Sequence, residues 1–328
     1  MSDRRAVACL GCGRMARGIA VVFAYAGHPV TLVDVKTRDA AGFAATAKQA
    51  HDEINATLSS MARLGLFAET ATTHIMSRVS VLPESQADGV LAAAAAIFEC
   101  VPEVLELKRD VLARISALAG PGPIIASTTS TILVDDLSTA LTDPRRFLNS
   151  HFLNPAFLVP LVEVSPGQTT DPLVVIDMKA LLEGAGKVPV VCAARPGYIV
   201  PRIQALAMNE AARLVEEGVA SAADVDKAIK YGFGVRFAVL GLLEFIDWGG
   251  GDILYYASRY LTHALGSERY AAPEIVERNM HEGRTGLTAR KGFLDYENLD
   301  IDAYRDDRLQ AFVALLKHFD MLRPPVLS

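Results

Sequence analysis

The chain has 328 residues, of which 51% are hydrophobic, and a formal net charge of −6. This length allows two domains, and the negative charge without a dense Lys/Arg run argues against a nucleic-acid partner. No uncharged apolar stretch of about 18 residues occurs, so we expect no membrane-spanning helix. Four cysteines in a chain of this size favour reduced thiols and a cytoplasmic protein over a disulfide framework.

The start of the chain predicts a strand, a glycine-rich turn, a helix and a second strand. Residues 5–10 are a short apolar run typical of a buried strand, and residues 15–25 carry apolar side chains at helical spacing. Gly27 falls where that helix should end, and residues 29–33 form the second apolar run. This order is typical of the βαβ unit of a dinucleotide-binding fold.

The turn between the first strand and the helix reads G-x-G-x-x-A. Gly11 allows the tight turn, Gly13 lets the backbone approach a pyrophosphate, and Ala16 is small enough for close helix–strand packing. The helix that starts at Arg14 and Met15 offers backbone N–H groups and the positive end of its dipole to phosphates. We therefore expect these five residues to bind the cofactor.

Asp34 follows the second strand, at the distance from the glycines where dinucleotide-binding folds place an acidic residue. Its carboxylate can accept hydrogen bonds from the ribose hydroxyls and would repel a 2′-phosphate. The sequence thus favours NAD over NADP, although Lys36 is close enough to keep NADP in consideration.

Cys9 and Cys12 form a CxxC pair at the same place in the chain. A redox pair needs exposed cysteines at a helix N-terminus, and a zinc site needs a second pair of ligands. Cys9 is expected inside the first strand and Cys12 inside the phosphate-binding turn. We therefore interpret the CxxC as incidental and expect no metal site.

Further along, residues 37–78 look largely helical, and two apolar runs, 92–98 and 124–127, predict buried parallel strands. The second run ends in a cluster of serines and threonines that contains Ser130. Polar residues at the carboxyl ends of parallel strands face the ligand crevice of such folds. A simpler alternative for Ser130 is that it caps the next helix.

Residues 151–155 read HFLNP, and Glu163 follows in a second short apolar segment. GCGRMARGIA, ECVPEVLELK and ASTTST precede them in the chain, and KGFLDY follows them. Together these residues resemble the L-3-hydroxyacyl-CoA dehydrogenase family. The resemblance runs along nearly the whole chain. It implies a Rossmann-type fold and NAD-dependent oxidation of the 3-hydroxyl of an L-3-hydroxyacyl-CoA, a small-molecule substrate of fatty-acid metabolism.

The resemblance also implies roles for individual residues. His151 would be the general base, which suits an imidazole with a pKa near neutrality, and Glu163 would fix its tautomer. Ser130 and Asn154 match polar residues around the substrate oxygen and the nicotinamide. An alternative for His151 is a core histidine bonded to the backbone.

On the cofactor side, Glu103 and Lys108 match a pair of the family. The alternative for Lys108 is an ordinary solvated lysine on a helix face.

A domain boundary is expected where Arg195-Pro196-Gly197 interrupts the chain after a strand-like run at 188–191. Residues 1–194 would form the doubly wound α/β domain with NAD and the His/Glu pair. Residues 195–328, in which helical patterns dominate, would form a smaller all-α domain. In the family this second domain closes the active site and forms a homodimer, so the resemblance implies a homodimer here.

Two positions depart from the acyl-CoA members of the family. Pro201 stands where they have an asparagine that holds the substrate carbonyl, so one polar contact is missing. Arg236 lies in a segment similar to that of gulonate and carnitine dehydrogenases, where it could hold a substrate carboxylate. The alternative is that Arg236 pairs with Glu244 or Asp247. The substrate thus stays open between a CoA thioester and a small free 3-hydroxy acid.

The family also contains lens crystallins, so a non-enzymatic protein is an alternative of another class. The presence of both His151 and Glu163 argues for an enzyme.

Overall fold

The computed structural model describes residues 4–326. The chain divides into two compact units, Met1–Ala207 and Met208–Ser328, and the division falls within helix α8 (Val200–Glu216). No described helix combines the length and the apolar character needed to cross a bilayer.

The first unit is built on an eight-stranded sheet with the order β3-β2-β1-β4-β5-β6-β7-β8. Neighbouring strands are parallel except β6 and β7, which are antiparallel. The strand order reverses at β1, whose neighbours are β2 and β4, and ligands bind at the carboxyl ends of the strands at such a point. The strands are β1 (Val7–Leu10), β2 (Val30–Asp34), β3 (Val79–Pro83), β4 (Ala96–Glu99), β5 (Ile124–Ser127), β6 (Phe147–Phe152), β7 (Leu161–Pro166) and β8 (Val188–Val191).

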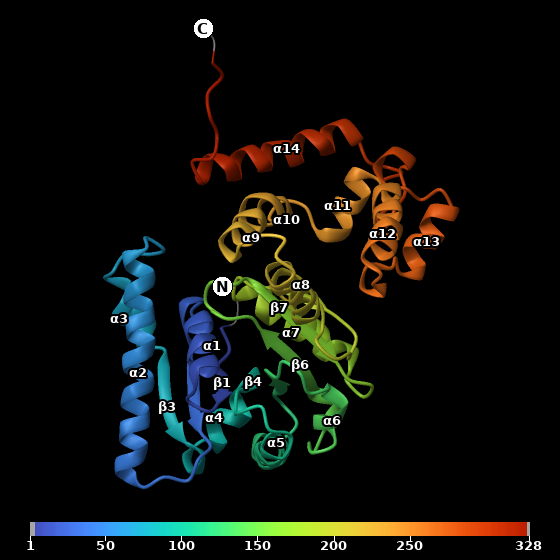
Figure 1. The fold of residues 1–328 in the computed structure, drawn as a ribbon. Coiled ribbons are helices and arrows are strands. Elements are labelled where there is room, and N and C mark those ends of the chain that lie inside the picture. The colour runs from blue at the N-terminus through green and yellow to red at the C-terminus, as the bar shows by residue number, and fades with distance from the viewer. Residues whose placement is uncertain (1–3, 327–328) are drawn as a thin grey trace. The chain divides into compact units, whose positions relative to one another are not determined.

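Helices cover both faces of this sheet (Figure 1). Successive side chains of a strand point to opposite faces, so Val7 and Cys9 of β1 pack with α1, α2 and α7, while Ala8 and Leu10 pack with α4, α5 and α6. The helices of this unit are α1 (Arg14–Tyr25), α2 (Ala40–Arg63), α3 (Ala71–Met76), α4 (Asp88–Ala93), α5 (Leu105–Ala119), α6 (Val134–Ser138) and α7 (Pro172–Gly184). The α/β fold expected from the sequence is confirmed.

One expected strand is shorter than the sequence suggests. The apolar run 92–98 was expected to be one strand, but its first two residues end α4 and β4 begins only at Ala96. Alanine has the highest helix propensity of all residues and packs poorly in a strand. A run of alanines therefore marks a buried segment without specifying its type.

The described part of the second unit is helical apart from turns and two isolated bridges. Its helices are α9 (Ala222–Ala228), α10 (Val235–Phe237), α11 (Leu242–Gly249), α12 (Gly251–Leu265), α13 (Glu274–His281) and α14 (Ile301–His318), and a π-helical turn, Ile229–Gly234, joins α9 to α10. The expectation of a smaller all-α part after the sheet is confirmed.

The loop that contains KGFLDY is held by the carboxylate of Asp247 in α11. This carboxylate accepts hydrogen bonds from the N–H groups of Phe293 and Leu294, at 2.9 and 2.8 Å, and from the hydroxyl of Tyr296 at 3.2 Å. Gly292 must be a glycine, because a Cβ there would lie 2.0 Å from a carboxylate oxygen of Asp247. Asp247 thus provides three of the hydrogen bonds that hold this loop within the unit.

Candidate active site

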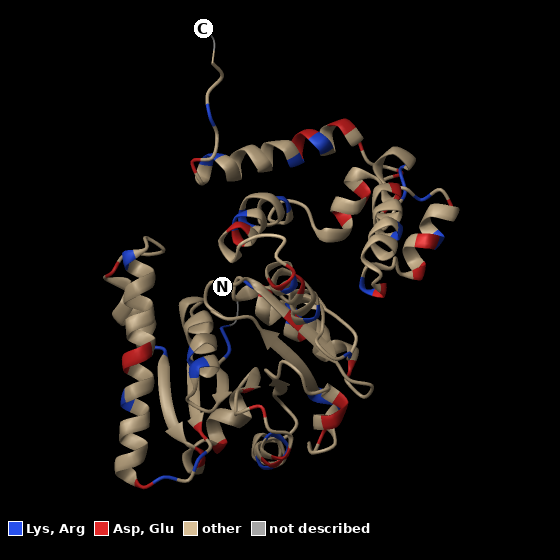
Figure 2. Cartoon of the chain, in the orientation of Figure 1, with Lys and Arg blue, Asp and Glu red and all other residues tan. Residues whose placement is uncertain are grey.

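Charged residues are rare in the sheet, as the mostly tan strands of Figure 2 show. Within the eight strands, Asp34, Glu99 and Glu163 are the only residues of the types Asp, Glu, Lys and Arg. All three are at most 4% exposed. Burying a carboxylate costs free energy unless it is paired. The bonding partners of these three acids therefore identify candidate functional positions in the sheet.

Glu163 is paired with His151 across the only antiparallel strand pair of the sheet. The register of β6 and β7 places the two residues opposite each other, and His151 Nδ1 lies 2.8 Å from Glu163 Oε2. The other carboxylate oxygen accepts hydrogen bonds from the N–H groups of Ile199 and Val200, at 2.9 and 2.8 Å. Because the carboxylate can only accept, Nδ1 carries the hydrogen and Nε2 has the lone pair that a general base needs. The alternative that Nδ1 of His151 is bonded to the backbone is thus wrong.

Tyr198, which the sequence analysis missed, packs against the imidazole of His151. The two rings are stacked with their centroids 5.2 Å apart. The Tyr198 hydroxyl donates to the carbonyl of Thr129 and accepts from the side-chain amide of Asn149, both at 3.0 Å. Burial raises the pKa of this hydroxyl, so it stays protonated. Its backbone is in the left-handed region, at φ 43°, and the preceding Pro196-Gly197 pair is the sequence signal for a turn at this position.

Glu103 organises the loop that follows β5. Its Oε1 accepts hydrogen bonds from the hydroxyl of Thr129, from the N–H of Ser130 at 3.1 Å, and from both the N–H and the hydroxyl of Thr131. Burial alone would raise the pKa of Glu103, but the bonds from Thr129 and Thr131 and the charge of Lys108 lower it. Ser130 is exposed and does not cap a helix, since α6 begins only at Val134. The capping alternative for Ser130 is wrong.

Lys108 is buried in the first unit, at 1% exposure. Its ammonium lies 2.9 and 3.0 Å from the two carboxylate oxygens of Glu99, and 3.4 Å from Glu103. Glu99 also accepts a hydrogen bond from the hydroxyl of Ser127 at 2.6 Å. The solvated-lysine alternative is therefore wrong. The sequence analysis missed Glu99, although an acid at the end of an apolar strand is a visible signal.

The turn after β1 has room for a diphosphate. Gly11 has φ 100°, where a side chain would be strained, and its N–H donates to the carbonyl of Val33 at 2.7 Å. A Cβ on Gly13 would meet no atom within 4 Å, and no side chain caps the N-terminus of α1. The first-turn N–H groups, from Arg14 onward, are thus available to phosphate oxygens, while Ala16 is fully buried, as close packing requires. These residues fit a dinucleotide.

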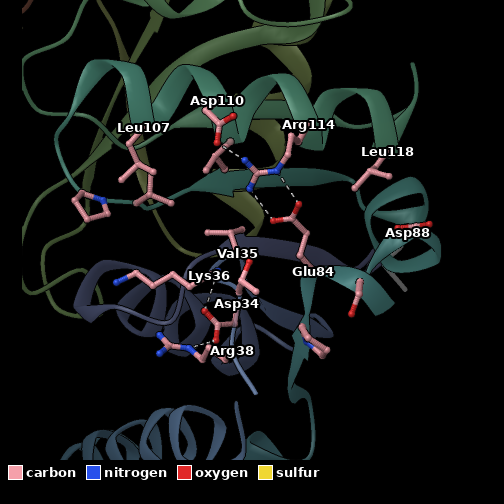
Figure 3. Close-up of a pocket in the computed structure, with 16 residues that line it drawn as sticks. Asp34, Val35, Lys36, Arg38, Glu84, Asp88, Leu107, Asp110, Arg114 and Leu118 are labelled. Atoms are coloured by element: carbon pink, nitrogen blue, oxygen red, sulfur yellow. Dashed lines mark hydrogen bonds and ion pairs between the residues drawn. The ribbon is translucent and has the colours of Figure 1, made fainter. Parts of the chain in front are cut away.

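Beside this turn, Asp34 borders a cavity of about 700 Å³, shown in Figure 3. Apolar side chains such as Val35, Val101 and Leu107 contribute to its lining and suit a flat aromatic base. The Asp34 carboxylate accepts from Arg38 Nε at 2.5 Å and from the N–H of Lys36 at 3.3 Å. The sequence analysis considered Lys36 but missed Arg38, whose contact depends on how the chain turns after β2.

Asn154 lies on the loop after β6. It is exposed and lines a second cavity, of about 340 Å³, together with Arg14 at the N-terminus of α1. Within this cavity Arg17 is already paired with Glu53 at 2.5 Å. The structure thus brings Asn154 close to the glycine-rich turn and leaves it accessible.

In the second unit, Arg236 has neither of the acid partners considered for it. Its Nε donates to the carbonyl of Gly232 at 2.9 Å, and its guanidinium lies over the ring of Phe245. Glu244 instead contacts Tyr304 and Arg308, and Asp247 holds the KGFLDY loop. The pairing alternative for Arg236 is wrong, and its guanidinium is exposed.

Comparison with known proteins agrees with this geometry. Residues 6–195 match the model of the 3-hydroxyacyl-CoA dehydrogenase NAD-binding domain, and residues 197–296 match that of the family's C-terminal domain. The chain belongs to the 3-hydroxyacyl-CoA dehydrogenase family. As a member of it, the protein is an NAD-dependent oxidoreductase.

Individual relatives of this dehydrogenase family differ in their substrates. An L-carnitine dehydrogenase of Streptomyces coelicolor is 35% identical over 83% of this chain and 82% of its own. A 3-hydroxybutyryl-CoA dehydrogenase of Bradyrhizobium diazoefficiens is 32% identical over 88% of this chain and 94% of its own. The crystal structure of a 3-hydroxyacyl-CoA dehydrogenase from Archaeoglobus fulgidus matches with a TM-score of 0.75 and 30% identity, over 97% of this chain and 100% of its own.

The cysteine pair of this dehydrogenase does not have the properties of a redox pair. Cys9 is buried in β1, and its contact with Cys100 together with burial raises the pKa of its thiol. Burial raises the pKa of Cys12 to about 11. A reactive cysteine needs the thiolate form, which neither residue adopts near neutral pH.

Proposed function

We propose that the protein oxidises the 3-hydroxyl group of a 3-hydroxyacyl-type substrate to a ketone, with His151 as the general base. The observation that carries the proposal is the 2.8 Å contact between His151 and a fully buried Glu163. When bound, NAD supplies the hydride acceptor.

In the proposed reaction, Nε2 of His151 removes the proton of the substrate hydroxyl while a hydride leaves the carbon atom that bears this hydroxyl. The imidazole becomes positively charged in this step, and the carboxylate of Glu163 stabilises that charge. The bonds from Ile199 and Val200 keep the carboxylate in place. Stacking on Tyr198 restrains the plane of the ring.

The remaining candidates surround this step. Ser130 and Asn154 are both exposed, so their side chains can reach a ligand, and we assign them polar contacts to the substrate oxygen and the nicotinamide. Glu103 is assigned to the cofactor side. Lys108 is buried, so it acts there by positioning Glu103 rather than by touching a ligand.

The finer identity of the substrate has two candidates. Membership of the family supports a 3-hydroxyacyl-CoA of the 3-hydroxybutyryl type. The exposed guanidinium of Arg236, with Glu244 and Asp247 bonded elsewhere, supports a small free 3-hydroxy acid whose carboxylate it would bind. Pro201, which has no polar side chain, points the same way, since the thioester carbonyl loses a donor there.

The test measures NADH absorbance with L-3-hydroxybutyryl-CoA and with free acids that include L-carnitine and gulonate. Turnover of a free acid that falls at least ~30-fold in kcat/KM for Arg236→Gln supports the carboxylate role. Turnover of the thioester alone, unchanged by this substitution, would show that Arg236 has no part in substrate binding. Arg259→Gln, which removes another exposed arginine of the second unit, is the matched control.

The protein is also proposed to be a homodimer through its second unit. Ile253, Tyr256 and Tyr260 lie on one face of α12 at spacings of three and four residues, and each is more than 60% exposed. An exposed apolar stripe of this kind is typical of an interface between subunits.

A cytoplasmic location is proposed from the cysteines. All four are free. Free thiols are kept in the reducing conditions of the cytosol.

A further inference from the structure

Two cationic side chains follow Asp34 at the edge of the large cavity. Arg38 contacts the Asp34 carboxylate through Nε, at 2.5 Å, which leaves its terminal nitrogen atoms outside this bond. Lys36 uses only its backbone N–H on the same carboxylate. In Figure 3 the amino group of Lys36 and the guanidinium of Arg38 lie on the same side of Asp34.

This arrangement combines features that normally separate two kinds of cofactor site. An acid at the end of the second strand binds the ribose hydroxyls of NAD, whereas nearby arginine accommodates the 2′-phosphate of NADP. An arginine binds phosphate oxygens through paired N–H groups, and a lysine adds a point charge. Here both cations are already in place, and the buried carboxylate of Asp34 is paired with Arg38.

We propose that Lys36 and Arg38 form a latent site for the 2′-phosphate of NADP, and that Asp34 alone reserves the cavity for NAD. The carboxylate excludes the phosphate in two ways. It repels the phosphate charge, and its ion pair with Arg38 offsets the positive charge that would otherwise attract the phosphate. Arg38 is thereby a specificity-determining residue whose effect Asp34 masks.

The test replaces Asp34 by Ser or Asn in the full chain and measures binding of NADPH and NADH by the fluorescence of the reduced nicotinamide, without substrate. We expect the Kd of NADPH to fall by roughly 10- to 100-fold and that of NADH to rise by about 10-fold, since each charge-assisted bond gained or lost changes affinity by about tenfold or more. Asp34→Asn keeps the shape of the side chain and an oxygen for the N–H of Lys36. Calorimetric titration with adenosine 2′,5′-bisphosphate should give the same gain.

Two triple variants separate this site from a general effect of charge. D34S/K36Q/R38Q removes both cations of the site, and D34S/K48Q/R145Q removes a lysine and an arginine that are exposed elsewhere in the first unit. The first should lose the gain in NADPH affinity and the second should keep it. If D34S and D34N, shown to be folded by thermal unfolding, bind NADPH no more tightly than the native protein, the proposal is overturned. It is equally overturned if D34S/K36Q/R38Q keeps the gain.

Discussion

In the proposed mechanism, the chemistry depends on one histidine, His151, whose free nitrogen is Nε2. Replacing His151 by Ala removes the base, so we expect kcat to fall by roughly 10²- to 10⁴-fold. Binding of NADH should persist, because the glycine-rich turn is untouched. Steady-state kinetics and fluorescence titration measure the two effects. Full activity of this variant would rule out the proposed mechanism.

Glu163→Gln tests the tautomer rather than the base. The amide oxygen can still accept from Ile199 and Val200, which directs the amide NH2 toward Nδ1 of His151 and favours the hydrogen on Nε2. We expect kcat to fall on the order of 10³-fold or more with little change in the KM for NAD. Glu183→Gln, an exposed substitution in α7, should leave both constants unchanged. Equal activity of the two variants would contradict the assignment.

Glu103 predicts a pH dependence of stability. Its pKa in the folded protein is lowered from 4.5 by Thr129, Lys108 and Thr131 against the effect of burial. The stabilisation is therefore complete above pH 4.5 and is lost as the pH falls through the lowered pKa. Urea unfolding should show that Glu103→Gln has a lower free energy of unfolding than the native protein at pH 7. This difference should shrink as the pH falls below 4.5. A difference that grows on acidification would contradict the lowered pKa of Glu103.

Among the elements, the KGFLDY loop depends on α11 through a single side chain. Asp247→Asn replaces one accepting oxygen by a donor that faces backbone N–H groups, so we expect a loss of about 1–3 kcal/mol in the free energy of unfolding. Trypsin should then cut faster at Arg290 and Lys291, which lie in that loop. The control is Asp226→Asn in α9, where the side chain is exposed. Equal stability and equal cleavage of the two variants would mean that the loop is held by its other contacts.

The antiparallel pairing of β6 and β7 is the element that creates the site. In an otherwise parallel sheet, this pair brings together two residues twelve positions apart in the chain. The loop between β8 and α8 completes it by adding Tyr198 and two backbone donors. His151 therefore contacts both Glu163 of β7 and Tyr198 of the loop between β8 and α8.

For the whole molecule, the exposed face of α12 predicts an assembly. Replacing Tyr256 and Tyr260 together by Glu should convert a dimer to a monomer, because two charges would have to be buried at the interface. Sedimentation velocity measures the change. Replacing both by Phe keeps the apolar face and should preserve the dimer. A native protein that sediments as a monomer at all concentrations would refute the assembly.

The sequence by itself determined those features that depend on local order along the chain. The glycine-rich turn and Asp34 are defined by spacing, because the strands and the helix around them have strong periodicity. The HFLNP segment with Glu163 is identified by its resemblance to the family. The family and the use of NAD follow from these motifs. The limits of the strand at 92–98 did not follow, because alanine does not distinguish a helix from a buried strand.

Only the tertiary structure decided which side chains are partners. Lys108 is bonded to Glu99 and Asp34 to Arg38, and Tyr198 reaches His151 from far along the chain. Glu244 and Asp247, the acids considered as partners of Arg236, are bonded elsewhere. Such pairings depend on strand register and on turns that bring distant segments together, and a buried charge takes whichever partner that packing supplies.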